Sequence, residues 1–226
     1  MSLAPHAIVT GASSGIGAAV ARRLLDDGWA VTGVSRTPPA AGIAHVALDL
    51  GQAAAEQVRA ALNPVPATAL VHAAGMLRVG QLGALDPASG TAMWRLHVEA
   101  ACLLMEAVAP SMAAGGRVVL LGSRTATGSP GRSQYAATKA AMVALARSWA
   151  AELAPRGLTV NVVAPGATDT PMLHDPARAG VPPKPPPIGR FIHPEEVAAL
   201  VAFLLSPDAG AITGQQLVIC GGASLH

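Results

Sequence analysis

The chain has little of several residue types, and each scarcity excludes a class of protein. Only 12% of its 226 residues are charged and the net charge is +2, so no concentrated basic face is expected to bind nucleic acid. Its two cysteines lie far apart without a CxxC spacing, which indicates reduced thiols rather than a disulfide framework. Hydrophobic residues make up 51%, which is too many for a disordered chain.

The sequence also lacks the signals that direct a chain to a membrane or to a metal. It has no uninterrupted apolar run of about 18 residues, so no membrane span is expected. The amino terminus passes from MSLAPH directly into AIVTGASSG, without the basic and then apolar segments of a secretory signal. No His, Cys and carboxylate cluster has the spacing of a metal site. These absences predict a cytoplasmic protein without a bound metal.

Short apolar, β-branched runs alternate with helical segments along most of the chain. The runs are hydrophobic throughout rather than at alternate positions, as in strands covered on both faces. The pattern predicts one α/β domain over residues 1–226, a Rossmann-like, doubly wound parallel sheet of about seven strands, whose order should resemble 3-2-1-4-5-6-7. The expected strands are 6–10, 30–35, 45–48, 68–72, 117–122, 158–164 and 216–220, and the expected helices are 15–27, 52–62, 88–109, 133–154 and 194–205.

One segment, residues 171–193, departs from this alternation. It holds six prolines among residues 176–187, which exclude both a helix and a central strand. A loop of this length in a compact domain is typical of a lid or binding loop, so we expect it to cover the substrate. The alternative is a merely connecting surface segment.

A glycine-rich turn follows the first expected strand and opens the first helix. The sequence VTGASSGIG places Gly11, Gly15 and Gly17 there, where glycine permits positive φ and close backbone approach. The free N–H groups and the positive dipole at the helix start suit a pyrophosphate, and Ser13 and Ser14 can donate hydroxyls or cap the helix. The context is that of a dinucleotide site, although the spacing is GxxxGxG rather than GxGxxG.

The sequence YAATK holds the only tyrosine of the chain and one of its two lysines. On a helix, Tyr135 and Lys139 share a face. A lysine ammonium favours the phenolate and is expected to lower the pKa of the tyrosine from its ordinary value of about 10 toward the working range. Ser123 ends the fifth expected strand, where its hydroxyl can hydrogen-bond a substrate oxygen. Without the nucleotide turn, a surface pair on an amphipathic helix would be the better interpretation.

Together, TGASSGIG and YAATK resemble the classical short-chain dehydrogenase/reductase family. The resemblance extends along the chain through HAAG (72–75), GS (122–123), VNVVAPGATDTPM (160–172), GRFIHPEEVAALVAFLLS and ITGQQLVICGG. It implies an NAD(P)H-dependent oxidoreductase that interconverts a ketone or aldehyde and an alcohol. In the family's mechanism the serine orients the substrate, the tyrosine donates or accepts the proton, and the lysine also binds ribose hydroxyls. These roles would fall to Ser123, Tyr135 and Lys139.

The end of the second expected strand indicates which nicotinamide nucleotide is bound. An acidic residue there would accept from a ribose 2′-hydroxyl and repel a 2′-phosphate, but this chain has Ser35 and Arg36. A guanidinium pairs with phosphate, so NADP(H) is favoured over NAD(H), the alternative being that Arg36 is a solvated loop cation. Asp49 either accepts from the adenine amine or caps the following helix. The full set of expected cofactor contacts is Gly11, Ser13, Ser14, Gly15, Ile16, Gly17, Ser35, Arg36, Asp49, Leu50, Ala74, Gly75, Tyr135, Lys139, Pro165, Gly166, Thr168 and Thr170.

The main departure from the family lies at His97, which takes the place of an asparagine that orders a water in the proton relay. Histidine donates and accepts through two nitrogens, but it is bulkier and its charge depends on pH. Three interpretations stay open: a working substitute in the catalytic set, a packed helix residue, or a weakened relay. HAAG also lacks both asparagines of the family's Asn-Asn-Ala-Gly, while His72 itself is expected to pack rather than react.

Several functional alternatives remain at this stage. A non-catalytic NADP-binding sensor or partner protein on the same fold is the main rival, whereas an epimerase of the extended branch would need a longer carboxy-terminal domain. The resemblance implies a homotetramer or dimer that packs helices 88–109 and 133–154 against a neighbour. The substrate is left open between a small polar ketone, a 3-oxoacyl thioester and a polycyclic compound. Three arginines near expected pocket loops hint at an anionic substrate, namely Arg78, Arg124 and Arg190.

Overall fold

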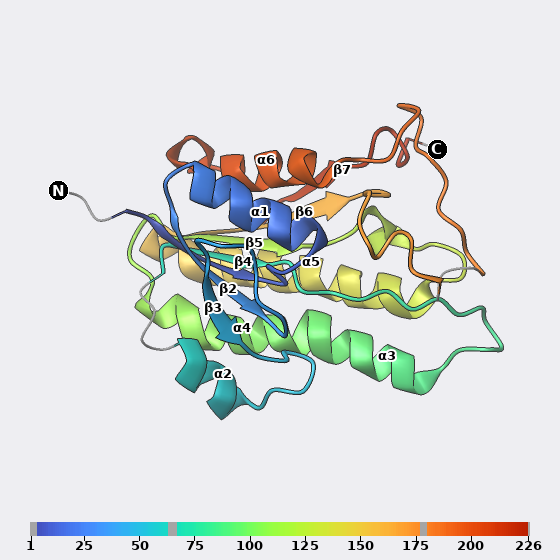
Figure 1. Ribbon diagram of the computed structural model, residues 1–226, viewed down its shortest axis with the longest axis horizontal. Coiled ribbons are helices and arrows are strands. Elements are labelled where there is room, and N and C mark those ends of the chain that lie inside the picture. The colour runs from blue at the N-terminus through green and yellow to red at the C-terminus, as the bar shows by residue number, and fades with distance from the viewer. Residues whose placement is uncertain (1–3, 63–66, 177–179, 226) are drawn as a thin grey trace.

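The structure, a computed structural model, describes residues 4–62, 67–176 and 180–225. Its strands form one seven-stranded sheet in the order β3-β2-β1-β4-β5-β6-β7, and every adjacent pair is parallel (Figure 1). The Rossmann-like fold class and the strand order expected from the sequence are therefore confirmed. The strands are β1 His6–Thr10, β2 Ala30–Ser35, β3 Ala44–Ala47, β4 Ala69–His72, β5 Arg117–Leu121, β6 Thr159–Pro165 and β7 Gln216–Ile219.

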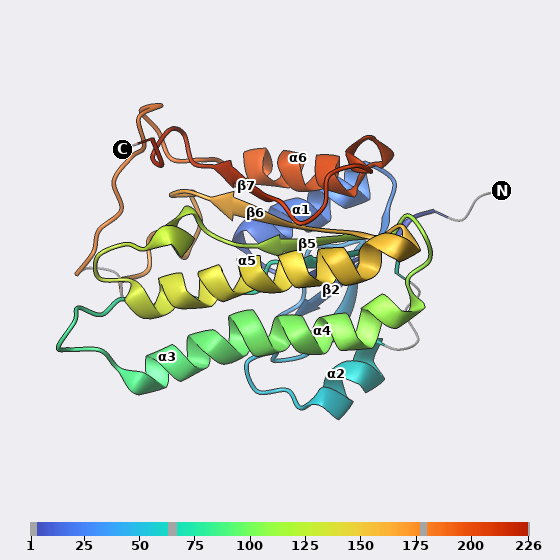
Figure 2. The same cartoon turned by 180° about the vertical axis from the view of Figure 1, so that it is seen from behind.

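Helices cover both faces of the sheet. The helices α1 and α6 lie on one face, and α2, α4 and α5 lie on the other (Figures 1 and 2). Successive strand side chains point to opposite faces, so Ile8 packs toward α4 and α5 while Ala7 and Val9 pack toward α1 and α6. This double burial explains the unbroken apolar runs of the sequence. The helices are α1 Gly15–Asp26, α2 Ala55–Leu62, α3 Pro87–Trp94, α4 Ala100–Val108, α5 Ser133–Leu153 and α6 Pro194–Leu205, with short turns η2 Ala109–Ser111, η3 Arg124–Thr127, η4 Ala154–Arg156 and η6 Pro207–Ala209.

The helix expected over 88–109 is helical but not uniform. Between α3 and α4 the chain makes a π-helical turn, η1 Arg95–Glu99, in which the Ala100 N–H donates to the Arg95 carbonyl five residues earlier. Such turns insert one residue into an α-helix and are frequent at functional sites. Hydrophobic periodicity does not reveal the inserted residue. His97 lies in this turn, on the side of the helix that faces the protein interior, and is fully buried.

The helix expected to begin at 52 begins instead at Ala55. The chain first makes a separate turn in which the Asp49 carbonyl accepts from the N–H groups of Gln52 and Ala53. The Gln57 side-chain oxygen then accepts from the Ala54 N–H at 2.8 Å, which satisfies a donor that the first helical turn leaves free. No helix in the described ranges combines the length and apolar character that a membrane span requires.

The carboxy ends of the strands meet at one edge of the sheet, opposite the amino terminus of the chain (Figure 1). The loops that follow β4, β5 and β6 therefore come together there, including residues 171–176 and 180–193 of the expected substrate loop, whose residues 177–179 lie outside the described ranges. In open parallel sheets this edge is where ligands bind. The described part of that loop is anchored: the Ile188 N–H donates to the Gly221 carbonyl at 3.2 Å, and Ile188 and Pro186 pack over Gly221.

Candidate active site

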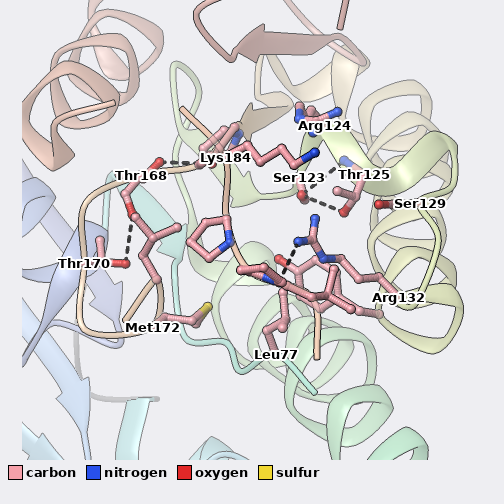
Figure 3. Close-up of a pocket in the computed structure, with 18 of the residues that line it drawn as sticks. Leu77, Ser123, Arg124, Thr125, Ser129, Arg132, Thr168, Thr170, Met172 and Lys184 are labelled. Carbon is pink, nitrogen blue, oxygen red and sulfur yellow. Dashed lines mark hydrogen bonds between the residues drawn. The ribbon is translucent and has the colours of Figure 1, made fainter. Parts of the chain in front are cut away.

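A cavity of about 440 Å³ opens at the carboxy edge of the sheet, between the loop after β5, the start of α5 and the segment after β6 (Figure 3). It brings Ser123 and Tyr135 together, although twelve residues separate them in the sequence. It also joins them to residues of the first turn and of the loop after β6. The lining consists of Ile16, Leu77, Gly122, Ser123, Arg124, Thr125, Ser129, Pro130, Arg132, Tyr135, Pro165, Gly166, Ala167, Thr168, Thr170, Met172, Leu173, Val181, Pro182, Pro183 and Lys184.

Tyr135 and Lys139 lie one turn apart on the buried face of α5. Their exposed fractions are 8% and 4%, and the Lys139 Nζ lies 5.7 Å from the centroid of the tyrosine ring. The ammonium donates to the Leu121 carbonyl at 2.8 Å and contacts the Met142 sulfur at 3.5 Å. Burial lowers the pKa of Lys139 to about 7. A lysine in this position exchanges its proton near neutral pH, as an acid–base group must.

Ser123 stands where β5 ends and the short turn η3 begins. Its extended backbone turns the hydroxyl back onto the chain, so that Oγ accepts from the Thr125 N–H at 3.2 Å. The Thr125 hydroxyl lies 2.9 Å from the same Oγ, and both residues line the cavity. When Thr125 donates in this contact, the hydroxyl hydrogen of Ser123 is free for a ligand oxygen. This role of Thr125 could not be predicted from the sequence alone.

His97 lies behind the tyrosine and does not line the cavity. Its Nε2 accepts from the Met76 N–H at 3.0 Å, so Nδ1 carries the hydrogen and donates to the Thr138 hydroxyl at 2.8 Å. Thr138 in turn donates to the Tyr135 carbonyl at 2.8 Å. Burial, followed by the nearby Lys139 and His72, lowers the pKa of His97 well below its ordinary value. The imidazole is therefore neutral and both of its nitrogens are occupied by protein groups.

A second buried histidine, His72, lies at the end of β4 and makes a hydrogen bond through each of its ring nitrogens. Thr10 Oγ1 accepts from the N–H groups of Ala73 and Ala74 and donates to His72 Nδ1 at 2.9 Å. The other nitrogen, Nε2, donates to the Leu96 carbonyl in the π turn at 3.2 Å. Burial is the main cause that lowers the pKa of His72 to about 3. The packing role expected for His72 is confirmed, and its ring ties β4 to the π turn.

The glycine-rich turn has the shape of a phosphate cradle. Gly11 and Gly15 have φ of +66° and +54°, and a Cβ on Gly11 would lie 2.9 Å from the backbone of Ala74. A Cβ on Gly17 would lie 2.3 Å from the Gly11 carbonyl oxygen, so the turn closes only with glycine there. Ser14 makes no capping bond with its side chain, which leaves the first N–H groups of α1 available to an anion.

Other residues expected to contact a dinucleotide lie on either side of this turn. Thr170 stands directly over Gly15, where an added Cβ would come within 3.4 Å of its methyl group. At the other end Ser35 is buried and donates to the Thr37 carbonyl at 2.7 Å, whereas Arg36 is exposed. Asp49 is exposed and one of its carboxylate oxygens accepts from the Gly51 N–H at 3.0 Å. That bond caps the turn before α2, not the helix itself.

The arginines named from the sequence as hints of an anionic substrate separate in the structure. Arg78 faces Asp175 at 3.7 Å and Arg190 binds both carboxylate oxygens of Glu196, at 2.7 and 2.9 Å, so neither points to a ligand. Arg124 does line the cavity, and two further cations line it that sequence reasoning missed, Arg132 and Lys184. Within the described ranges no group of three His, Cys, Asp or Glu residues could hold a metal ion.

Comparison with known proteins agrees with this geometry. Residues 11–224 match the family described as enoyl-(acyl carrier protein) reductase. The 3-oxoacyl-[acyl-carrier-protein] reductase FabG of Salmonella typhimurium is 35% identical, with 96% of each chain covered. The chain belongs to the short-chain dehydrogenase/reductase family. It is accordingly an NAD(P)(H)-dependent oxidoreductase that interconverts a ketone or aldehyde and an alcohol.

Solved structures of short-chain dehydrogenases/reductases superpose on the whole fold. A Burkholderia cenocepacia member in complex with NADP has a TM-score of 0.86 and 36% identity, with 97% of both chains covered. The aldohexose dehydrogenase of Thermoplasma acidophilum has a TM-score of 0.91 and 29% identity, covering 99% of this chain and 95% of that one. The names of FabG and of the aldohexose dehydrogenase give different substrates, so membership of the family does not by itself identify the substrate of this chain.

Proposed function

We propose that the chain is an NADP(H)-dependent carbonyl reductase in which Ser123, Tyr135 and Lys139 form the reacting centre. The observation that carries the proposal is the shared cavity, in which Ser123 and Tyr135 line one side while Ile16, Gly166 and Thr170 continue it toward the glycine-rich turn. A nicotinamide nucleotide bound along that turn would supply the hydride. The single domain of 1–226, with 171–193 over the substrate, acts as one unit in this proposal.

Each protein group has a distinct task in the proposed reaction. Ser123 donates to the carbonyl oxygen of the substrate, held in position by Thr125. Tyr135 gives its proton to the same oxygen as negative charge develops there, or takes it back in the reverse direction. Lys139 stabilises the phenolate by its charge and, because its pKa lies at about 7, can return a proton near neutrality. Its ammonium also lies on the side where ribose hydroxyls are expected.

His97 has a positioning task in this proposal rather than a chemical one. Both ring nitrogens are committed to Met76 and Thr138, and protonating Nε2 would break the bond to the Met76 N–H. Its ring also packs nearly perpendicular to that of Tyr135, with 5.6 Å between ring centroids and 84° between planes. It therefore fixes the loop after β4 and the first turn of α5. Of the three interpretations left open by the sequence, the packed helix residue is the one we adopt.

NADP(H) is favoured over NAD(H) because of Arg36. No acidic residue stands at the end of β2, and the hydroxyl hydrogen of Ser35 is already given to the Thr37 carbonyl. The exposed guanidinium of Arg36 is then the group that would meet a 2′-phosphate. The NADP complex of the Burkholderia relative supports the same choice. A cytoplasmic location and a homotetramer or dimer that packs the helical segments 88–109 and 133–154 against a neighbour complete the proposal.

The test is NADPH oxidation, followed by nicotinamide absorbance, with a panel of small ketones, 3-oxo acids and 3-oxoacyl thioesters. The expected result is turnover of at least one probe together with NADPH binding. Tight NADPH binding with no turnover of any probe, in either direction, would instead support a non-catalytic sensor or partner protein. Both outcomes include NADPH binding, so the titration shows that the nucleotide site is intact and the rate measurement distinguishes the two.

A further inference from the structure

The cavity beside Ser123 and Tyr135 contains three cations and no carboxylate among its described lining residues. Arg124, Arg132 and Lys184 form this cationic trio. Its composition is unusual for a chain in which only 12% of residues are charged and in which Lys184 is the one lysine besides Lys139. Like charges gathered in one cavity repel one another, so a ligand of opposite sign would be favoured beside them.

Two members of the trio are placed by the same elements that place the reacting groups. Arg124 directly follows Ser123 at the end of β5, and Arg132 precedes Tyr135 by one helical turn at the start of α5. Both are half-buried, so their guanidinium groups face the cavity rather than the outer surface of the protein. In Figure 3 the side chains of Arg132 and Lys184 both extend toward Ser123. At least these two cations therefore lie on the side of the cavity where Ser123 stands.

Lys184 is carried by the proline-rich segment, which is fixed over the cavity. The Val181 carbonyl accepts from the Arg132 guanidinium at 3.4 Å, and a Cβ on Gly131 would lie 2.7 Å from a Val181 methyl group. Only glycine at 131 therefore lets the segment approach so closely. Within the described ranges no carboxylate pairs with Arg124 or with Lys184. Neither cation is neutralised by the protein itself.

We infer that the substrate is a small oxo acid, whose carboxylate lies a few bonds from the carbonyl and is bound by the cationic trio. The inference rests on the proposed function, because it takes the cavity beside Ser123 and Tyr135 as the substrate site. The cavity of about 440 Å³ must hold the nicotinamide ring as well, which leaves room for a small molecule only. An acidic partner protein could reach the exposed Lys184 but not the half-buried guanidinium groups of Arg124 and Arg132.

The first experiment compares three probes that differ in charge and share one carbonyl: 3-oxobutanoate, its methyl ester and its N-acetylcysteamine thioester. We expect kcat/KM of NADPH oxidation to be about tenfold or more higher for the acid, because only the acid forms charge-assisted bonds with the trio. Arg124→Gln and Lys184→Gln should each lower the value for the acid about fivefold, through KM, and leave the esters unchanged. Arg22→Gln, an exposed charge change on α1, is the matched control and should alter neither.

A binding measurement separates this inference from the proposed function. The protein saturated with NADPH is titrated with 3-hydroxybutanoate or its methyl ester, which form complexes that cannot react, and thermal denaturation is followed. Preferential binding of the acid, weakened by Arg124→Gln but not by Arg22→Gln, supports the inference even if no probe is reduced, in which case the proposed function fails alone. Equal binding of acid and ester, or faster reduction of the thioesters with no effect of the cavity variants, overturns the inference while leaving a carbonyl reductase.

Discussion

The buried centre around Tyr135 and the cationic trio at the mouth of the same cavity are built in opposite ways. In the centre, Lys139, His97 and Thr138 are at most 4% exposed, and each bonds to other protein groups. The trio is half-buried or exposed, and Arg124 and Lys184 have no carboxylate partner in the described part of the chain. In our proposal the closed network determines the type of reaction, whereas Arg124 and Lys184 contribute to the choice of substrate because neither has a carboxylate partner in that part of the chain.

Tyr135→Phe should break the centre and have the largest effect. The variant keeps the ring that packs against Leu77 and Met93 but removes the hydroxyl that we propose as the proton donor to the substrate oxygen, and the chain has no other tyrosine. We expect turnover to fall by about 10²- to 10⁴-fold with every substrate, while NADPH affinity stays within a few-fold of the wild type. Rates come from NADPH oxidation and affinity from nucleotide fluorescence. A variant with a near-normal rate would exclude Tyr135 as the acid.

Arg36→Ala tests whether an exposed cation selects a ligand without touching the centre. Losing a charge-assisted bond to a 2′-phosphate should weaken NADPH binding by about 10- to 100-fold, or roughly 1.5–3 kcal/mol. NADH, which lacks that phosphate, should bind as before, and kcat at saturating nucleotide should be unchanged. The measurement is a titration of each nucleotide, with Arg22→Ala as the control for charge alone. Equal losses for both nucleotides would refute the specificity argument.

His97→Leu tests the closed network of the centre. It leaves the buried Met76 N–H without an acceptor, at a cost of about 1–3 kcal/mol, and removes the donor to the Thr138 hydroxyl, which keeps its bond to the Tyr135 carbonyl. We expect a lower free energy of unfolding and a lower kcat, with partial rescue in His97→Asn, whose amide can still accept or donate. Because His97 does not titrate in the working range, the pH dependence of kcat should keep its shape. A shifted pH profile would mean that His97 transfers protons after all.

The two buried histidines should also make the fold sensitive to acid. The pKa of His72 is lowered from 6.5 to about 3, so the folded protein binds fewer protons than the unfolded chain below pH 6.5. The contribution of His72 to the free energy of unfolding is therefore fully present above that pH. It decreases by about 1.4 kcal/mol per pH unit as the pH falls toward 3. Urea unfolding at several pH values measures this slope. His72→Asn should flatten it.

Most of this closed network could not be predicted from the sequence, although the fold could. The alternation of apolar runs and helices predicts the strand order because parallel strands buried on both faces leave few other arrangements. The glycine turn, Ser123, Tyr135 and Lys139 are recognisable because their chemistry needs those residue types. The bonds of Thr10, Thr125 and Thr138 depend instead on which loops meet at the edge of the sheet. The π turn at His97 leaves no periodic signal, and Lys184 reaches the cavity only because the proline-rich segment is folded over it.

Thr125→Val should have the smallest effect and marks the boundary between the two regions. Thr125 is 6% exposed and lines the cavity, and its hydroxyl bonds only to Ser123 among the described residues. Valine keeps the shape of the side chain and the backbone N–H that donates to Ser123 Oγ. It removes the hydroxyl that orients that oxygen. A neutral hydrogen bond contributes about 0.5–1.5 kcal/mol, so kcat should fall about threefold to tenfold with KM little changed.

Ser129→Ala removes another hydroxyl of the same lining, one that makes no side-chain bond to Ser123, and should leave kcat unaltered. Equal losses in the two variants would mean that Thr125 acts only as part of the cavity wall, and that the closed network ends at Ser123.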